Sequence, residues 1–253
     1  MKETRLLMGM PITVDIADKN AAGSDINKIF DYFKYVDKKF SPFKENSEIT
    51  KINNGQVKEE NYSEDVKEIF ELSEQTKKET YGYFDIIDNN GKYNPSGIVK
   101  GWAIYKAAEL LENMGYKNFY VDAGGDIQVY GKNAQKDNWK IGIKNPFKTN
   151  EIIKVVYLDK NQGIATSGTY IRGQHIYNPK SRDEKMSEIV SISIIGPNVY
   201  EADRFATAAF AMQGEGVNFI EKLDGFEAYM IDKNGIATMT SNFEKYTNAK
   251  INR

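Results

Sequence analysis

Asp203 and Thr207 lie four residues apart in the segment Glu-Ala-Asp-Arg-Phe-Ala-Thr-Ala-Ala-Phe. The segment is predicted to be helical, so both side-chain oxygens project from one face and could bind the same cation. Mg²⁺ prefers hard oxygen ligands and accepts few protein carboxylates, which suits one carboxylate and one hydroxyl. The residues alone leave a structural alternative open, in which Asp203 caps the first helical turn and Thr207 is a half-buried helix residue.

Gly124 and Gly125 lie within Asp-Ala-Gly-Gly-Asp, between two predicted strands. Glycine permits positive φ and the close approach of a ligand, so these two N–H groups could bind a diphosphate. The flanking Asp122 and Asp126 could orient a ribose or a threonine hydroxyl. Glycine and aspartate are also common turn residues, so a simple turn is the competing interpretation.

Lys100 and His175 are the other candidates for chemistry. Lys100 stands near the start of a predicted helix, where free N–H groups and the helix dipole favour a phosphate. The surrounding Ser-Gly-Ile-Val-Lys-Gly does not match a Walker A loop, so a nucleoside triphosphate site is unsupported. His175 is the only histidine, and its unperturbed pKa suits a general base near neutrality. A solvated lysine and a structural histidine are the ordinary alternatives.

A mixed set of helices and strands must position these residues. Alternating apolar residues predict a strand over Pro11–Ala17, and apolar residues at helical spacing predict a helix over Asp25–Phe40. A polar loop is expected over Ser41–Asn54. Further helices are predicted over Ser63–Glu79 with Ser63 as its N-cap, Gly97–Asn113 and Tyr200–Gln213, and further strands over 118–121, 127–130, 140–143, 152–158, 163–166 and 189–195. Because no regular βαβ rhythm appears, we expect one α+β domain over residues 1–253.

The composition excludes several classes of protein. Hydrophobic residues make up 40% of the 253 residues and aromatic residues 12%, which argues against disorder. The net charge of −2 gives no field that would attract nucleic acid. No apolar run is long enough to span a membrane, and residues 1–18 are predicted to form a strand instead of a signal peptide, so a cytoplasmic location is expected. The absence of cysteine excludes disulfides and thiolate chemistry.

Taken in order, these motifs resemble the ApbE family of FAD:protein FMN transferases over nearly the whole chain. The segments that carry the resemblance are Met8-Gly9-Met10-Pro11-Ile12-Thr13-Val14, Phe40-Ser41-Pro42-Phe43, Asn46-Ser47-Glu48-Ile49 with Asn53, Phe84-Asp85, Gly97-Ile98-Val99-Lys100-Gly101-Trp102-Ala103, Asp122-Ala123-Gly124-Gly125-Asp126, Ala165-Thr166-Ser167-Gly168, His175-Ile176-Tyr177-Asn178-Pro179 and Asp203-x-x-Ala206-Thr207-Ala208.

The resemblance implies an ApbE-like fold and a Mg²⁺-dependent transfer of FMN from FAD to a threonine or serine of an acceptor flavoprotein, with AMP as the leaving group. It implies that Asp203, Thr207 and the Gly97 carbonyl hold Mg²⁺ against the FAD diphosphate. His175 would take the proton of the acceptor hydroxyl, and Lys100 would offset negative charge. The residues expected to contact FAD are Met10, Phe43, Lys100, Gly124, Gly125, Asp126, Thr166 and Ser167.

The chain departs from the family pattern at several positions. Asn94, Tyr105 and Asn178 stand where the family usually has aspartate, and Met10 stands where it has threonine. The connection between Phe84-Asp85 and Gly97 is also shorter than usual. Two alternatives stay open: a Mg²⁺-dependent FAD pyrophosphatase, in which water attacks, and an FAD-binding protein without turnover, which these departures suggest. The presence of Asp203, Thr207 and His175 argues against the second.

Overall fold

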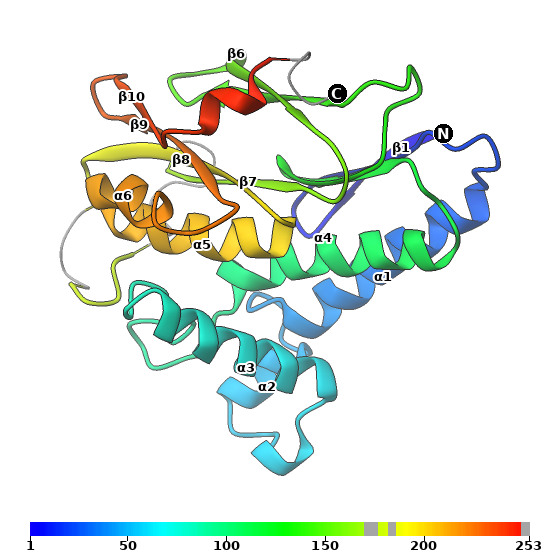
Figure 1. Ribbon diagram of the computed structural model, residues 1–253. Coiled ribbons are helices and arrows are strands. Elements are labelled where there is room, and N and C mark those ends of the chain that lie inside the picture. Colours follow the sequence, from blue (N-terminus) through cyan, green and yellow to red (C-terminus); the bar gives the residue numbers. More distant parts are fainter. Residues whose placement is uncertain (170–176, 182–185, 249–253) are drawn as a thin grey trace.

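A computed structural model describes residues 1–169, 177–181 and 186–248 (Figure 1). Its helices in this part of the chain are α1 Gly23–Phe40, α2 Glu48–Asn53, α3 Glu64–Glu79, α4 Ser96–Asn113, α5 Val199–Ala211 and α6 Gly216–Ile220, with short 3₁₀ turns η1 Glu59–Asn61, η2 Gln213–Glu215 and η3 Phe243–Tyr246. Its strands are β1 Lys2–Leu7, β2 Met10–Ile16, β3 Phe119–Ala123, β4 Asp126–Tyr130, β5 Trp139–Asn145, β6 Lys148–Leu158, β7 Gly163–Gly168, β8 Ile189–Gly196, β9 Glu227–Asp232 and β10 Ala237–Met239.

The strands form one large antiparallel sheet and a separate hairpin. The large sheet has eight strands in the order β1-β2-β3-β4-β7-β8-β9-β10, and β5 pairs with β6 outside it. Every neighbouring pair is antiparallel. Helices packed on an antiparallel sheet are the expected α+β architecture, and the predicted helices and strands are confirmed with shifted ends.

Helices cover one face of the large sheet, and the β5–β6 hairpin covers the other (Figure 1). Helices α1, α4 and α5 lie directly under the sheet, with α2 and α3 beyond them (Figure 1). Strand β7 shows how the alternation divides the two faces: Ala165 belongs to the apolar core formed with α5, whereas Ile164 belongs to the core beneath the hairpin. The odd-numbered residues of β7 therefore face the helices.

Two local predictions were incomplete. The stretch from Met1 to Asp18 contains two strands, β1 and β2, because Met8 and Gly9 form a turn with positive φ between them. The expected loop over Ser41–Asn54 contains the short helix α2, which Ser47 caps by accepting the Thr50 N–H at 3.1 Å.

The predicted N-cap residue of α3 is confirmed by position but not by its hydrogen bond. Ser63 occupies the N-cap position of that helix, but its side chain accepts no hydrogen bond from the first turn. Its hydroxyl instead donates to Glu48 at 2.8 Å, and its N–H donates to the same carboxylate at 2.8 Å. Ser63 therefore ties the start of α3 to α2.

Candidate functional site

Helices α4 and α5 pack against each other in antiparallel fashion and so bring together the two motifs that are predicted to bind a metal. The Gly101 N–H donates to Asp203 Oδ2 at 2.7 Å, and the Thr207 hydroxyl donates to the Gly97 carbonyl at 3.3 Å. Gly97 lies four residues before Gly101 on α4, and Asp203 lies four residues before Thr207 on α5. The two contacts are therefore about one helical turn apart along the crossing. The structure thus places the carboxylate, the hydroxyl and the carbonyl on one crossing.

Gly101 permits this close approach. A Cβ atom at Gly101 would lie 2.6 Å from the Asp203 Cβ and 2.9 Å from the Val199 carbonyl oxygen. A Cβ atom at Gly97 would be less crowded, at 3.2 Å from the Thr207 Cγ2. Backbone cannot yield to such contacts as a flexible side chain can, so residue 101 must be glycine for the crossing to keep this separation.

Lys100 and Asp126 complete the cluster beside Asp203. The Lys100 Nζ lies 3.4 Å from Asp203 Oδ1 and forms an ion pair with Asp126 Oδ2. Asp126 is at the start of β4 on the helix-facing side, and its Oδ1 accepts the Thr166 N–H at 3.0 Å. Its Oδ2 is buried and, apart from the ion pair with Lys100, has no hydrogen bond among the described residues. One ammonium therefore faces two buried carboxylates.

Burial dominates the electrostatics of Asp203. Desolvation raises its pKa to about 7, the neighbouring Asp126 carboxylate adds to the rise, and the Lys100 ammonium opposes it. Two carboxylates and one ammonium leave a net negative charge when all three groups are ionised. A cation at this crossing would compensate that charge.

The donors at the crossing fit a hard divalent cation. The Asp203 carboxylate, the Thr207 hydroxyl and the Gly97 carbonyl are all oxygen donors, the type that Mg²⁺ prefers. In residues 1–169, 177–181 and 186–248, no group of three or more His, Cys, Asp or Glu side chains could hold a metal ion. A site with a single carboxylate matches Mg²⁺, which usually keeps waters and substrate phosphate as its other ligands.

The glycine turn between β3 and β4 has the predicted backbone, but its donors are already used. Gly124 and Gly125 have φ of +66° and +103°. The Gly124 N–H donates to the Pro11 carbonyl at 3.1 Å, and the Gly125 N–H donates to Asp122 Oδ1 at 2.8 Å. A diphosphate at these amides would have to replace both bonds. Met10 packs against this turn, with its Sδ 3.0 Å from where a Cβ at Gly124 would lie.

Not all of the remaining residues predicted to contact FAD point toward the crossing. Thr166 joins it only through its backbone, because its hydroxyl lies on the far face of the sheet and bonds Ser193 Oγ at 2.7 Å. Ser167 is buried, and the alternation of β7 places it on the helix face. Phe43, before α2, is 90% exposed. His175 lies outside the described residues.

Two of the departures from the family pattern have a structural role here. The Asn94 Oδ1 accepts the Ser96 hydroxyl at 2.7 Å at the start of α4, and the Asn178 Oδ1 accepts the Lys180 N–H at 3.0 Å. Both bonds need only an oxygen acceptor, so a neutral amide serves as well as a carboxylate. Asn53 holds the connection between Phe84-Asp85 and Gly97 by bonding both the N–H and the carbonyl of Tyr93, at 2.8 and 2.9 Å.

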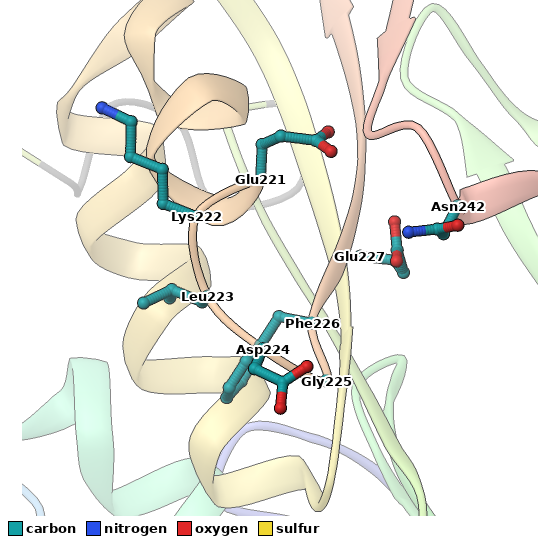
Figure 2. A pocket seen from close by; sticks show the side chains of 8 residues that line it. All are labelled: Glu221, Lys222, Leu223, Asp224, Gly225, Phe226, Glu227 and Asn242. Atoms are coloured by element: carbon teal, nitrogen blue, oxygen red, sulfur yellow. The ribbon is translucent and has the colours of Figure 1, made fainter.

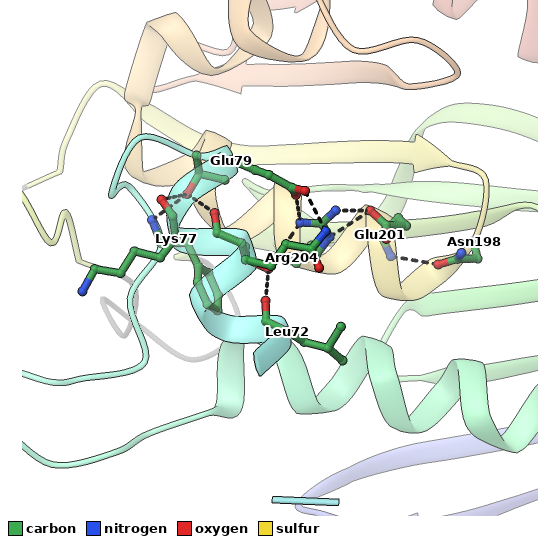
Figure 3. Close-up of polar contacts among 10 residues, drawn as sticks. Leu72, Lys77, Glu79, Asn198, Glu201 and Arg204 are labelled. Carbon is green, nitrogen blue, oxygen red and sulfur yellow. Dashed lines mark hydrogen bonds and ion pairs between the residues drawn. The ribbon is translucent and has the colours of Figure 1, made fainter. Parts of the chain in front are cut away.

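Arg204 is a structural residue that the sequence patterns did not reveal (Figure 3). It follows Asp203 on α5, yet its side chain is only 5% exposed. Its guanidinium pairs with Glu79 at the end of α3 and with Glu201 one turn earlier, where Nε donates at 2.8 Å. The only local signal was an arginine within a helix whose remaining residues are mostly alanine and other apolar types. This network joins α3 to the helix that carries Asp203 and Thr207.

Replacing Arg204 by methionine should lower the free energy of unfolding by about 2–3 kcal/mol, because it leaves two carboxylates without their partner. The cost stays below that of a fully buried pair, since Glu79 is 38% exposed and keeps water. Thermal denaturation should show a Tm lower by roughly 5–10 °C. The exposed Lys34–Asp31 pair offers a control, as Lys34→Met should leave the Tm nearly unchanged. Equal effects of the two substitutions would contradict this role for Arg204.

Two surface hollows lie away from the predicted site. The first, of about 310 Å³, is formed by the α6–β9 connection and Asn242 (Figure 2). The second, of about 400 Å³, lies over Arg204 and Phe205. None of the residues predicted to bind the metal or FAD lines either hollow.

In the described part of the chain, no helix is both long enough and apolar enough to cross a membrane.

Comparison with known proteins gives a consistent result. The model of the ApbE family matches residues 8–90 and 87–230. A protein of Haemophilus influenzae named FAD:protein FMN transferase is 30% identical over 167 residues, which are 61% of this chain and 48% of that protein. The Escherichia coli K12 protein of the same name is 27% identical over 148 residues, 55% of this chain and 42% of that protein. The match therefore spans less than half the length of each relative.

Solved structures share the fold over nearly their full length. The crystal structure of the ApbE protein of Thermotoga maritima has a TM-score of 0.86 at 21% identity and covers 98% of this chain and 99% of its own. The flavin transferase ApbE of Vibrio cholerae has a TM-score of 0.81 at 19% identity, with 97% and 98% covered. At these identities the likeness establishes the fold, which confirms the predicted class.

Proposed function

The chain belongs to the ApbE family, and we propose on that premise that it is a Mg²⁺-dependent FAD:protein FMN transferase. Its substrates are FAD and an acceptor flavoprotein with a threonine or serine at the modification site, and AMP is released. The observation that carries this proposal is the oxygen cluster at the α4–α5 crossing, where Asp203, Thr207 and Gly97 meet beside Lys100. The names of the curated relatives support the same reaction.

In the proposed reaction, the acceptor hydroxyl oxygen attacks the phosphorus of the FMN half of FAD. The bond from that phosphorus to the bridging oxygen breaks, and AMP leaves with that oxygen. His175 takes the proton of the hydroxyl. Bound Mg²⁺ would neutralise charge on the diphosphate and make the phosphorus more electrophilic.

The described residues supply the binding and orientation that this reaction needs. Asp203, Thr207 and the Gly97 carbonyl would hold the metal, and the Lys100 ammonium would attract the phosphates. The helix-facing side of the sheet presents Asp126 and Ser167 toward the same region. The proposed FAD contacts of Met10, Phe43, Gly124 and Gly125 complete the set, and Thr166 contributes through its N–H, which holds Asp126.

Replacing His175 by alanine should slow transfer to protein by about 10²- to 10⁴-fold, the usual contribution of a general base. FAD binding needs no proton removal, so the dissociation constant for FAD should stay within about two-fold. Stopped-flow or quench assays of acceptor labelling, with FAD fluorescence for binding, measure both quantities. Labelling at the unchanged rate would remove His175 from the mechanism.

Product analysis tests the function itself. The chain is incubated with FAD and Mg²⁺, with and without a flavoprotein acceptor, and AMP and free FMN are quantified. A transferase releases AMP in an acceptor-dependent way, and chelation of Mg²⁺ stops it. Free FMN and AMP without acceptor would support the pyrophosphatase, whereas FAD binding without cleavage would support a binding protein.

A cytoplasmic location belongs to the same proposal, and recovery of the chain only from an exported or membrane fraction would contradict it.

A further inference from the structure

Lys100 lies where it competes with a metal for Asp203. The Asp203 Oδ2 already accepts the Gly101 N–H at 2.7 Å, so a cation would bond more readily through Oδ1. That same Oδ1 lies 3.4 Å from the Lys100 Nζ. A divalent ion bonded to Oδ1 at about 2.1 Å would therefore stand close to a like charge.

The Lys100 ammonium is more exposed than the two carboxylates, and each carboxylate is held by a backbone N–H. The Lys100 side chain is 23% exposed, while those of Asp126 and Asp203 are 2% and 3% exposed. The Thr166 N–H holds Asp126 and the Gly101 N–H holds Asp203. A lysine has a flexible four-carbon stem and carries a compact charge, so it can exchange one anionic partner for another.

We propose that Lys100 is a built-in counter-ion that occupies Asp203 until a diphosphate draws its ammonium away. The inference rests on the proposed function, because it takes Asp203 as a metal ligand and FAD as the source of the diphosphate. In the absence of nucleotide, the ammonium weakens metal binding at Asp203. When a diphosphate is bound, the ammonium transfers to it, and Asp203 Oδ1 becomes available. Metal and dinucleotide consequently bind with positive coupling.

Calorimetric titration with magnesium chloride alone tests the competition without any need for turnover. Lys100→Met should tighten Mg²⁺ binding by about ten-fold or more, because it removes a positive charge next to the ligand oxygen. Lys100→Gln, which keeps a polar group between the carboxylates, should act in the same direction and serves if the methionine variant folds poorly. The matched control is Lys106→Met on the same helix, whose ammonium pairs with Glu68 and Glu109, and which should leave Mg²⁺ affinity unchanged.

The same titration with saturating ADP, corrected by a titration of Mg²⁺ into ADP without protein, tests the transfer of the ammonium. The difference in Mg²⁺ affinity between the unmodified chain and Lys100→Met should shrink, since the ammonium then pairs with phosphate. Equal or weaker Mg²⁺ binding by both Lys100 variants, or an undiminished difference with ADP, would overturn the proposal. A separate outcome bears on the function: if Asp203→Asn binds Mg²⁺ as tightly as the unmodified chain, the metal site itself is wrong.

Discussion

Replacing Asp203 by asparagine should reduce Mg²⁺-dependent FAD cleavage by about 10³-fold or more. The substitution removes the carboxylate among the three proposed metal ligands, and a metal supplies several kcal/mol of stabilisation to the transition state, where about 1.4 kcal/mol is a factor of ten. The asparagine oxygen can still accept the Gly101 N–H, so the packing of α4 on α5 should survive. Steady-state AMP release at several Mg²⁺ concentrations measures the effect.

Two variants control this experiment. Asp203→Ala removes the charge and the acceptor of the Gly101 N–H together, so it should lose both activity and stability. Glu221→Gln changes an exposed carboxylate of the hollow in Figure 2, and should leave cleavage unchanged. Cleavage by Asp203→Asn within ten-fold of the unmodified rate, with the same Mg²⁺ dependence, would remove Asp203 from the site.

Replacing Gly101 by alanine should both destabilise the chain and disable the site. The added Cβ would lie 2.6 Å from the Asp203 Cβ and 2.9 Å from the Val199 carbonyl oxygen, so the two helices must separate. Overpacking of this kind costs about 2–3 kcal/mol. A displacement of Asp203 by about 1 Å would reduce turnover on the order of 10²-fold. Chemical denaturation and AMP release measure the two effects.

Gly23 provides a matched glycine-to-alanine control. It is the first residue of α1, and a Cβ there would have no atom within 4 Å. Gly23→Ala should therefore be neutral or stabilising by up to about 1 kcal/mol, because alanine favours the helix. Similar stability and activity losses in Gly23→Ala and Gly101→Ala would show that the helix crossing is not the cause.

The positions of the helices and the residues that share a helix face could be predicted from the sequence. The apolar residues of α1, such as Ile26, Phe30 and Phe33, recur with helical spacing because they pack under the sheet, and the spacing alone predicts the helix. Asp203 and Thr207 could be paired for the same reason, since helical periodicity fixes which residues share a face. The motifs in order indicated the family, which the family match then confirmed.

The tertiary contacts could not be predicted in the same way. Gly101 and Asp203 are 102 residues apart, and the ion pair of Lys100 with Asp126 depends on how α4 lies on the sheet. No local pattern encodes that placement. Ser63 has the residue type and position of an N-cap, yet its hydroxyl donates to the Glu48 carboxylate. Only the fold brings these two residues together.

The most direct test of the proposed function is the intact mass of an acceptor flavoprotein after incubation with this chain, FAD and Mg²⁺. We expect the acceptor to gain one FMN while FAD releases an equal amount of AMP, and we expect no modification when the target threonine or serine is replaced by alanine. An acceptor of unchanged mass in a reaction that nevertheless accumulates free FMN and AMP would contradict the transferase and establish hydrolysis in its place.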